Sequence, residues 1–128
     1  MAKTVDEILT EARAKLERLD PDQTQKAIAN GAVLIDIRSD NQRAQDGIVP
    51  VAVHVPRNVL EWRCDPQSDY RDDRVSDSQK RIVVMCNEGY ASSLAAADLQ
   101  ELGHEDATDL VGGFQAWRAA GLPVDRPG

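Results

Sequence analysis

The chain has few cysteines, few histidines and no long apolar run, and these absences narrow the classes of protein to which it can belong. Among its 128 residues, two are cysteine and two are histidine. Two cysteines do not make the disulfide framework of a small secreted protein, and neither has a Cys or His partner at zinc-site spacing. No apolar stretch reaches membrane-spanning length, and the charged N-terminal residues do not resemble a signal peptide. We therefore expect no metal, no membrane partner and a cytoplasmic location.

The chain also has fewer basic than acidic residues. Fifteen Lys and Arg residues stand against 22 Asp and Glu residues, which gives a formal net charge of -7. Proteins that bind nucleic acid are usually basic, so we expect no nucleic-acid partner. The acidity does not identify another partner, because an acidic surface also serves simply to keep a protein in solution.

The length and the hydrophobic fraction of 41% fit one domain with one core. We predict a single domain over residues 1–128, with residues 1–20 as an N-terminal helix appended to it. Thr4 and Glu7 have the spacing of a capping box. Apolar residues then recur at helical spacing as far as Leu19.

Apolar strand-like runs alternate with helical patterns through the rest of the chain. Strands are predicted at residues 32–36, 51–55, 82–85 and 107–111, and helices at 22–29, 58–64, from 92 to about 102, and from 113 onward. This alternation is typical of an α/β protein with a mostly parallel sheet covered by helices on both faces. Residues 65–80 are polar without periodicity, which predicts a long surface loop where mobility or a lid over the site is expected.

Cys86 follows an apolar strand and precedes a short loop with Gly89 and a helix that opens near Ser92. Its sulfur should therefore lie at the sheet edge where open α/β sheets bind ligands. The N–H groups of the loop can form an anion-binding nest, and the helix adds the positive end of its dipole. These effects favour the thiolate, which is the nucleophile. The alternative is a buried structural cysteine, since free Cys is often buried. Gly89 and the cap-forming Ser92 and Ser93 favour a reactive cysteine over a structural one.

Four segments, taken in order, resemble those of the rhodanese-like family. They are Leu34-Ile35-Asp36-Ile37-Arg38 (its Asp-x-Arg motif), residues 47–56 (its Gly-His-Ile-x-Gly-Ala segment), residues 86–92 (its active-site loop) and Gly112-Gly113-Phe114-Gln115-Ala116-Trp117 (its Gly-Gly-x-x-x-Trp ending). The resemblance extends from about Gln23 to Pro123.

This resemblance implies a three-layer fold with about five strands, no cofactor and the activity of a sulfurtransferase. Cys86 would take sulfane sulfur from thiosulfate or a persulfide, hold it as a persulfide, and pass it to a thiol or to cyanide. The loop would bind the anionic sulfur through its N–H groups; its residues are Asn87, Glu88, Gly89, Tyr90, Ala91 and Ser92. The expected partners are a small sulfur donor and a thiol acceptor, with a protein partner as an alternative.

The resemblance also implies roles for four residues outside the loop. Asp36 and Arg38 match family positions near the site, and we interpret them as a structural ion pair. Arg63 lies in the segment that flanks the site in the family and is a candidate for steering an anionic donor; an exposed helix charge is the alternative. Cys64 lies in the same segment, so a relay or a disulfide with Cys86 is conceivable, although two cysteines in a small domain often never meet.

One departure concerns the donor. The loop carries Glu88 and has no Arg or Lys between Cys86 and Ser93, whereas thiosulfate-using members often carry basic residues there. A carboxylate beside the sulfur repels an anionic donor. We therefore expect slow turnover with thiosulfate, and a neutral persulfide, a cationic donor or a protein partner should serve better.

Two rival functions share part of this pattern. Dual-specificity phosphatases have a related fold and need an arginine at the position that Ser92 occupies here, because its guanidinium holds the phosphoryl oxygens. This excludes a phosphatase. The other rival is a non-catalytic rhodanese-like module that binds a partner, and the presence of Cys86 favours an enzyme over it.

Overall fold

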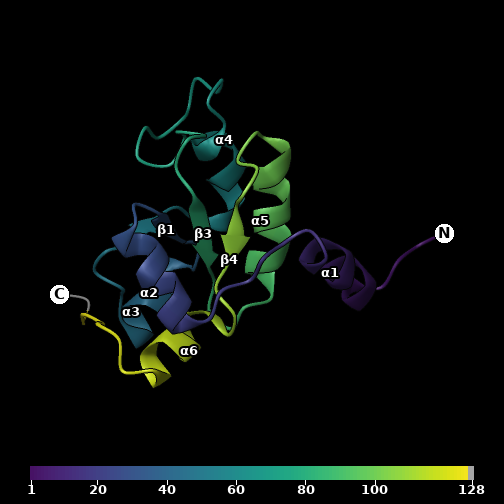
Figure 1. The fold of residues 1–128 in the computed structure, drawn as a ribbon. Coiled ribbons are helices and arrows are strands. Elements are labelled where there is room, and N and C mark those ends of the chain that lie inside the picture. The colour runs from purple at the N-terminus through teal and green to yellow at the C-terminus, as the bar shows by residue number, and fades with distance from the viewer. Residues whose placement is uncertain (127–128) are drawn as a thin grey trace.

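A four-stranded parallel sheet forms the centre of the molecule. The structure is a computed structural model, and it describes residues 1–126 (Figure 1). The strands are β1 (Val33–Asp36), β2 (Val53–His54), β3 (Ile82–Met85) and β4 (Thr108–Asp109), in the order β2-β1-β3-β4. The family resemblance implied about five strands, one more than the sheet has. What remains of a fifth is a single parallel bridge between Leu19 and Leu110, because the chain enters a helix at Pro21 immediately afterwards.

The two faces of the sheet carry separate apolar clusters. In β3, Ile82 and Val84 join one cluster, while Val83 and Met85 join the other, as the two-residue period of a strand requires. Helices α4 (Leu60–Cys64) and α5 (Ala91–Glu101) pack on the first face, and α2 (Pro21–Ala29) and α6 (Gly113–Ala119) pack on the second. The predicted three-layer α/β architecture is therefore confirmed.

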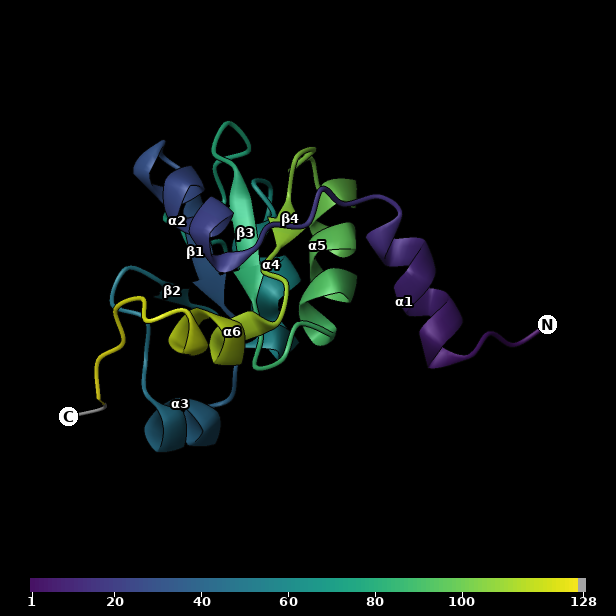
Figure 2. The same cartoon turned by 60° about the horizontal axis from the view of Figure 1, so that its bottom comes forward.

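The N-terminal helix is shorter than the sequence pattern predicted. Helix α1 (Val5–Arg13) begins with the predicted capping box between Thr4 and Glu7. It ends at Arg13, and the chain continues without helix to Leu19, whose amide donates to the Asp109 carbonyl at 3.1 Å. Leu19 pairs with the edge of the sheet, so the chain cannot continue as a helix there. The apolar side chains that suggested a longer helix pack instead in the two clusters, Leu16 in the first and Leu19 in the second. Figure 2 shows α1 beside α5, on the outer flank of the molecule.

The remaining connections position the site. Helix α3 (Asp40–Asp46) follows β1, and a 3₁₀ turn, η1 (Arg57–Val59), follows β2. The 65–80 segment has no helix or strand and enters β3 at its amino-terminal end, opposite the end that leads into Cys86. It contributes no residue to the cavity beside Cys86, so the expectation of a lid was wrong. Within residues 1–126, no helix combines the length and the apolar character needed to cross a bilayer.

Candidate active site

The sulfur of Cys86 lies inside the loop that joins β3 to α5. Its Sγ accepts the Gly89 N–H at 3.1 Å and the Ser92 N–H at 3.4 Å. Gly89 has φ +90°, a conformation that other residues resist, and this conformation allows the loop to close around the sulfur. The predicted nest of backbone donors is confirmed. Such donors stabilise a sulfur anion, and Cys86 is 7% exposed at the end of the buried strand.

The start of α6 holds the loop from its other side. The Phe114 N–H donates to the Cys86 carbonyl at 2.8 Å, and the Gln115 N–H donates to the Asn87 carbonyl at 3.1 Å. This approach needs glycine at position 113, since a Cβ there would lie 2.4 Å from the Cys86 carbonyl oxygen. The Gly-Gly segment thus lets the first turn of α6 bind the loop carbonyls.

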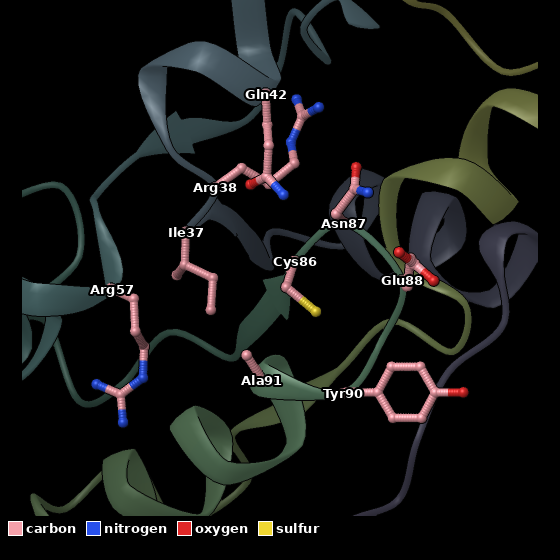
Figure 3. A pocket seen from close by; sticks show the side chains of 9 residues that line it. All are labelled: Ile37, Arg38, Gln42, Arg57, Cys86, Asn87, Glu88, Tyr90 and Ala91. Carbon is pink, nitrogen blue, oxygen red and sulfur yellow. The ribbon is translucent and has the colours of Figure 1, made fainter.

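A cavity of about 280 Å³ opens beside the sulfur (Figure 3). It is lined by Ile37, Arg38, Gln42, Arg57, Cys86, Asn87, Glu88, Tyr90 and Ala91. Most of the predicted loop residues are therefore brought together around the space in front of Cys86. In the view of Figure 3, Arg57 and Glu88 lie on opposite sides of the sulfur.

The segment after β2 contributes one cation to the cavity lining, and that cation is Arg57 and not Arg63. The Arg57 guanidinium pairs with Glu61 at 2.9 Å and with Asp98 at 3.1 Å. Burial raises the pKa of the Asp98 carboxyl above its ordinary value, and the Arg57 charge opposes that rise. Arg63 instead donates to the Tyr70 carbonyl at 2.9 Å, is partly buried and does not line the cavity. Position 57 could have been found from its place just after a parallel strand, because such strands end at the same sheet edge.

Asp36 and Arg38 form the ion pair that their positions predicted. Both side chains are buried, and the guanidinium bonds the two carboxylate oxygens at 3.1 and 3.0 Å. It also donates to the Gly47 carbonyl at 2.9 Å and lies 3.9 Å from the centroid of the Phe114 ring. Figure 3 shows the guanidinium directed away from the sulfur. The pair joins β1 to the end of α3 and to α6, and so fixes the rim of the cavity.

Asp109 is a buried carboxylate that the sequence did not single out. It accepts the Ser92 hydroxyl at 2.7 Å and the Ser93 hydroxyl at 2.8 Å, and it pairs with Arg18 at 2.9 Å. The two serines were expected to cap α5, but the helix begins at Ala91 and their hydroxyls bind Asp109. The Ser92 side chain therefore turns away from the cavity, and only its N–H reaches the sulfur.

Cys64 is separated from Cys86 by the length of α5. It is fully buried at the end of α4, and its carbonyl bonds His104, which follows the carboxyl-terminal end of α5. Cys86 lies at the amino-terminal end of that 11-residue helix, about 16 Å away along its axis. A disulfide needs Cα atoms within about 7 Å, so the folded chain cannot form one between these cysteines. Burial, with Glu61 and Asp72 nearby, raises the pKa of the Cys64 thiol to about 12.

The chain is similar to several known proteins. The sequence profile of the rhodanese-like domain matches residues 20–120. A thiosulfate sulfurtransferase GlpE of Pseudomonas savastanoi pv. phaseolicola is 34% identical over 105 residues, which cover 82% of this chain and 90% of that protein. Another of that name, from Haemophilus influenzae, is 31% identical over 85% of this chain and 94% of its own.

One solved structure is similar over nearly the whole chain. It comes from Rhodopseudomonas palustris and is described as a protein of unknown function and possible tyrosine phosphatase. It superposes with a TM-score of 0.89 at 32% identity, covering 98% of this chain and 96% of its own. Coverage of that extent includes the segment before residue 20, which the domain profile does not reach.

Proposed function

Because the chain belongs to the rhodanese-like domain family, we propose that it is a sulfurtransferase that carries sulfane sulfur on Cys86. One observation carries the proposal. The Cys86 sulfur lies at the wall of a cavity and accepts two backbone N–H groups from its own loop. A structural cysteine has no use for such donors, whereas a nucleophile that alternates between two anionic forms does.

The transfer follows from this geometry in two steps. The Cys86 thiolate attacks the outer sulfur of the donor, and the bond to that sulfur breaks with its electron pair leaving on the donor remnant, which is sulfite if the donor is thiosulfate. A cysteine persulfide anion remains. A thiolate or cyanide then attacks the terminal sulfur, and Cys86 leaves as the thiolate. The Gly89 and Ser92 N–H groups lie where negative charge sits in the thiolate, so they require little reorganisation.

The cavity suits a small donor. Its volume of about 280 Å³ is at the lower limit of small-molecule sites. Arg57 takes the place beside the donor for which Arg63 was the candidate, because it lines the cavity while Arg63 does not. Its charge is shared with Glu61 and Asp98, so we expect it to orient a donor more than to attract one.

Intact-mass measurement tests the proposal. The parent chain, exposed to thiosulfate or to glutathione persulfide, should gain one sulfur atom that a reductant removes, and it should convert cyanide to thiocyanate. Cys86→Ser should do neither while keeping its unfolding curve, and Cys64→Ser should behave like the parent. An adduct that persists in Cys86→Ser would overturn the assignment.

The rival functions give different results in the same assays. A non-catalytic binding module would take no sulfur from any donor, even though Cys86 reacts with alkylating reagents. A tyrosine phosphatase, the description given to the Rhodopseudomonas palustris protein, needs an arginine where this chain has Ser92. The Ser92 hydroxyl is buried against Asp109, so we expect no hydrolysis of p-nitrophenyl phosphate.

A further inference from the structure

The segment that precedes the family's domain reaches the catalytic loop. Arg13 ends α1, and Arg18 lies in the extended stretch before α2. Both guanidinium groups donate to one carbonyl of the loop, that of Gly89, at 2.8 Å from Arg13 and 2.9 Å from Arg18. The domain profile begins at residue 20, so neither arginine belongs to the part of the chain that it matches.

Each arginine has a second attachment near the loop. Arg13 donates to the Ser93 hydroxyl at 3.1 Å, and its guanidinium lies 5.6 Å from the centroid of the Tyr90 ring. Arg18 bonds both carboxylate oxygens of Asp109, at 2.9 and 3.1 Å. Hydrogen bonds with a charged partner are about twice as strong as neutral ones, so these contacts fix the loop firmly.

The contact orients the amides of the loop. A trans peptide unit directs its C=O and N–H to opposite sides. Because the arginines hold the Gly89 carbonyl, they fix the orientation of the peptide unit that joins Gly89 to Tyr90. The Gly89 N–H donates to the Cys86 sulfur. The arginines therefore act through the backbone of Gly89, whose carbonyl they hold while its N–H faces the sulfur.

The contact also brings positive charge to a loop that has none of its own. Among the lining residues, Arg38 and Arg57 are paired with carboxylates, and Glu88 is exposed without such pairing among the described residues. Arg18 is neutralised by Asp109. Over residues 1–126, no carboxylate lies within ion-pair distance of Arg13, so its charge is left to act on the loop.

We propose that residues 5–18 form part of the active site of this chain. Arg13 and Arg18 position the loop around Cys86, and Arg13 supplies the charge that draws an anionic sulfur donor to it and opposes Glu88. Both are positioning residues, because they touch the loop and not the sulfur. The donor role depends on the sulfurtransferase function proposed above.

Alkylation of Cys86 by two reagents of different charge tests the proposal without requiring sulfur transfer. Iodoacetate is an anion and iodoacetamide is neutral, so the ratio of their rate constants reports the local charge. In Arg13→Ala at low salt, we expect the iodoacetate rate to fall about fivefold and the iodoacetamide rate to fall less. Added salt should shrink the change in the ratio, and Arg13→Lys should restore the ratio.

Lys15→Ala is the matched control. It removes one positive charge from the same segment, and Lys15 is exposed with no side-chain hydrogen bond or ion pair in the part of the chain that the structure describes. We expect its alkylation ratio to equal that of the parent. If the ratio in Arg13→Ala also equals that of the parent, the charge role of Arg13 is overturned.

Arg18→Lys tests the positioning role. Replacement of Arg18 by Ala would leave the buried Asp109 without its cation, whereas Lys keeps the charge and loses the fork that reaches Gly89 and Asp109 together. We expect the unfolding midpoint to change little, the ratio to stay at the parent value, and both alkylation rates to change together by roughly twofold or more. Rates identical to those of the parent would contradict positioning. A parent chain that alkylates normally but transfers no sulfur would refute the proposed function alone.

Discussion

Surroundings, and not burial alone, separate the two cysteines of this chain. Both side chains are buried. Cys86 ends a strand and receives backbone N–H groups from the loop that follows. Cys64 packs in the apolar cluster under α5, with Glu61 and Asp72 as its charged neighbours. Only the first environment places backbone N–H donors on the sulfur.

The difference predicts selective labelling. Since the pKa of Cys64 is raised to about 12, its neutral thiol is favoured at every pH below that value, and it stays unreactive between pH 6 and pH 9 (about the usual labelling range). One equivalent of iodoacetamide should therefore label Cys86 alone in the native chain. Cys86→Ser should take up label only in denaturant. Peptide mapping that finds label on Cys64 of the native protein would contradict this prediction.

Glu88 sets a second prediction at the scale of one residue. Its carboxylate lines the cavity and is exposed. Two like charges several Å apart at such a site cost on the order of 1 kcal/mol, which corresponds to several-fold in rate. We expect kcat/KM for thiosulfate to rise in Glu88→Gln and to rise further in Glu88→Lys, with a gain that shrinks as salt is added. If both variants match the parent at low ionic strength, Glu88 does not tune the choice of donor.

Among the elements, α6 does more than cover the sheet. Its first turn binds the carbonyls of Cys86 and Asn87, and its Phe114 and Trp117 fill the cluster on the second face. The same short helix therefore anchors the loop around Cys86 and part of the core. Only a glycine at its first position allows both, because the loop backbone passes where a side chain would be.

Gly113→Ala should accordingly damage stability and activity together. The new Cβ would lie 2.4 Å from the Cys86 carbonyl oxygen, at a φ of +60°. We expect a loss of about 2–4 kcal/mol in the free energy of unfolding, measured in urea, and at least a tenfold loss of sulfur transfer. Gly121→Ala is the control, since Gly121 has φ +77° and a Cβ added there would meet no atom within 4 Å. An equal effect of both substitutions would show that backbone strain, and not the close approach, is what matters.

Across the whole molecule, the first 19 residues connect with both faces of the sheet. Leu16 packs against the cluster under α5, and Leu19 lies in the cluster on the opposite face. Leu19 also extends the sheet beyond β4, with hydrogen bonds of 3.1 and 2.8 Å on its two sides. A segment held in this way belongs to the cooperative unit of the domain.

We therefore predict that residues 1–19 unfold together with the rest of the chain. Leu19→Ala should lower the free energy of unfolding by about 3 kcal/mol while leaving a single transition. Far-UV circular dichroism and the fluorescence of the buried Trp117 should give the same midpoint, and the amides of Leu19 and Val111 should exchange as slowly as those of β3. Early exchange of the two amides at an unchanged midpoint would show that the segment is a separate attachment.

The sequence by itself was enough for the features that depend on neighbouring residues. The strands at residues 33–36 and 82–85, the helix from Pro21 and the nest around Cys86 all follow from apolar runs, caps and a glycine within a few positions of one another. Local sequence determines these features, because the signals act between residues that are only a few positions apart. The same local signals single out Cys86 as the candidate nucleophile.

Only the tertiary structure decided what surrounds that nucleophile. Arg13 and Gly89 are 76 positions apart, and their contact exists because α1 packs along α5. The same holds for the choice of Arg57 over Arg63 and for the extended course of Leu19, where pairing with the sheet overrides a helical period. No window of sequence contains both partners of these contacts. Packing of the whole chain brings them together, and with them the charge around Cys86.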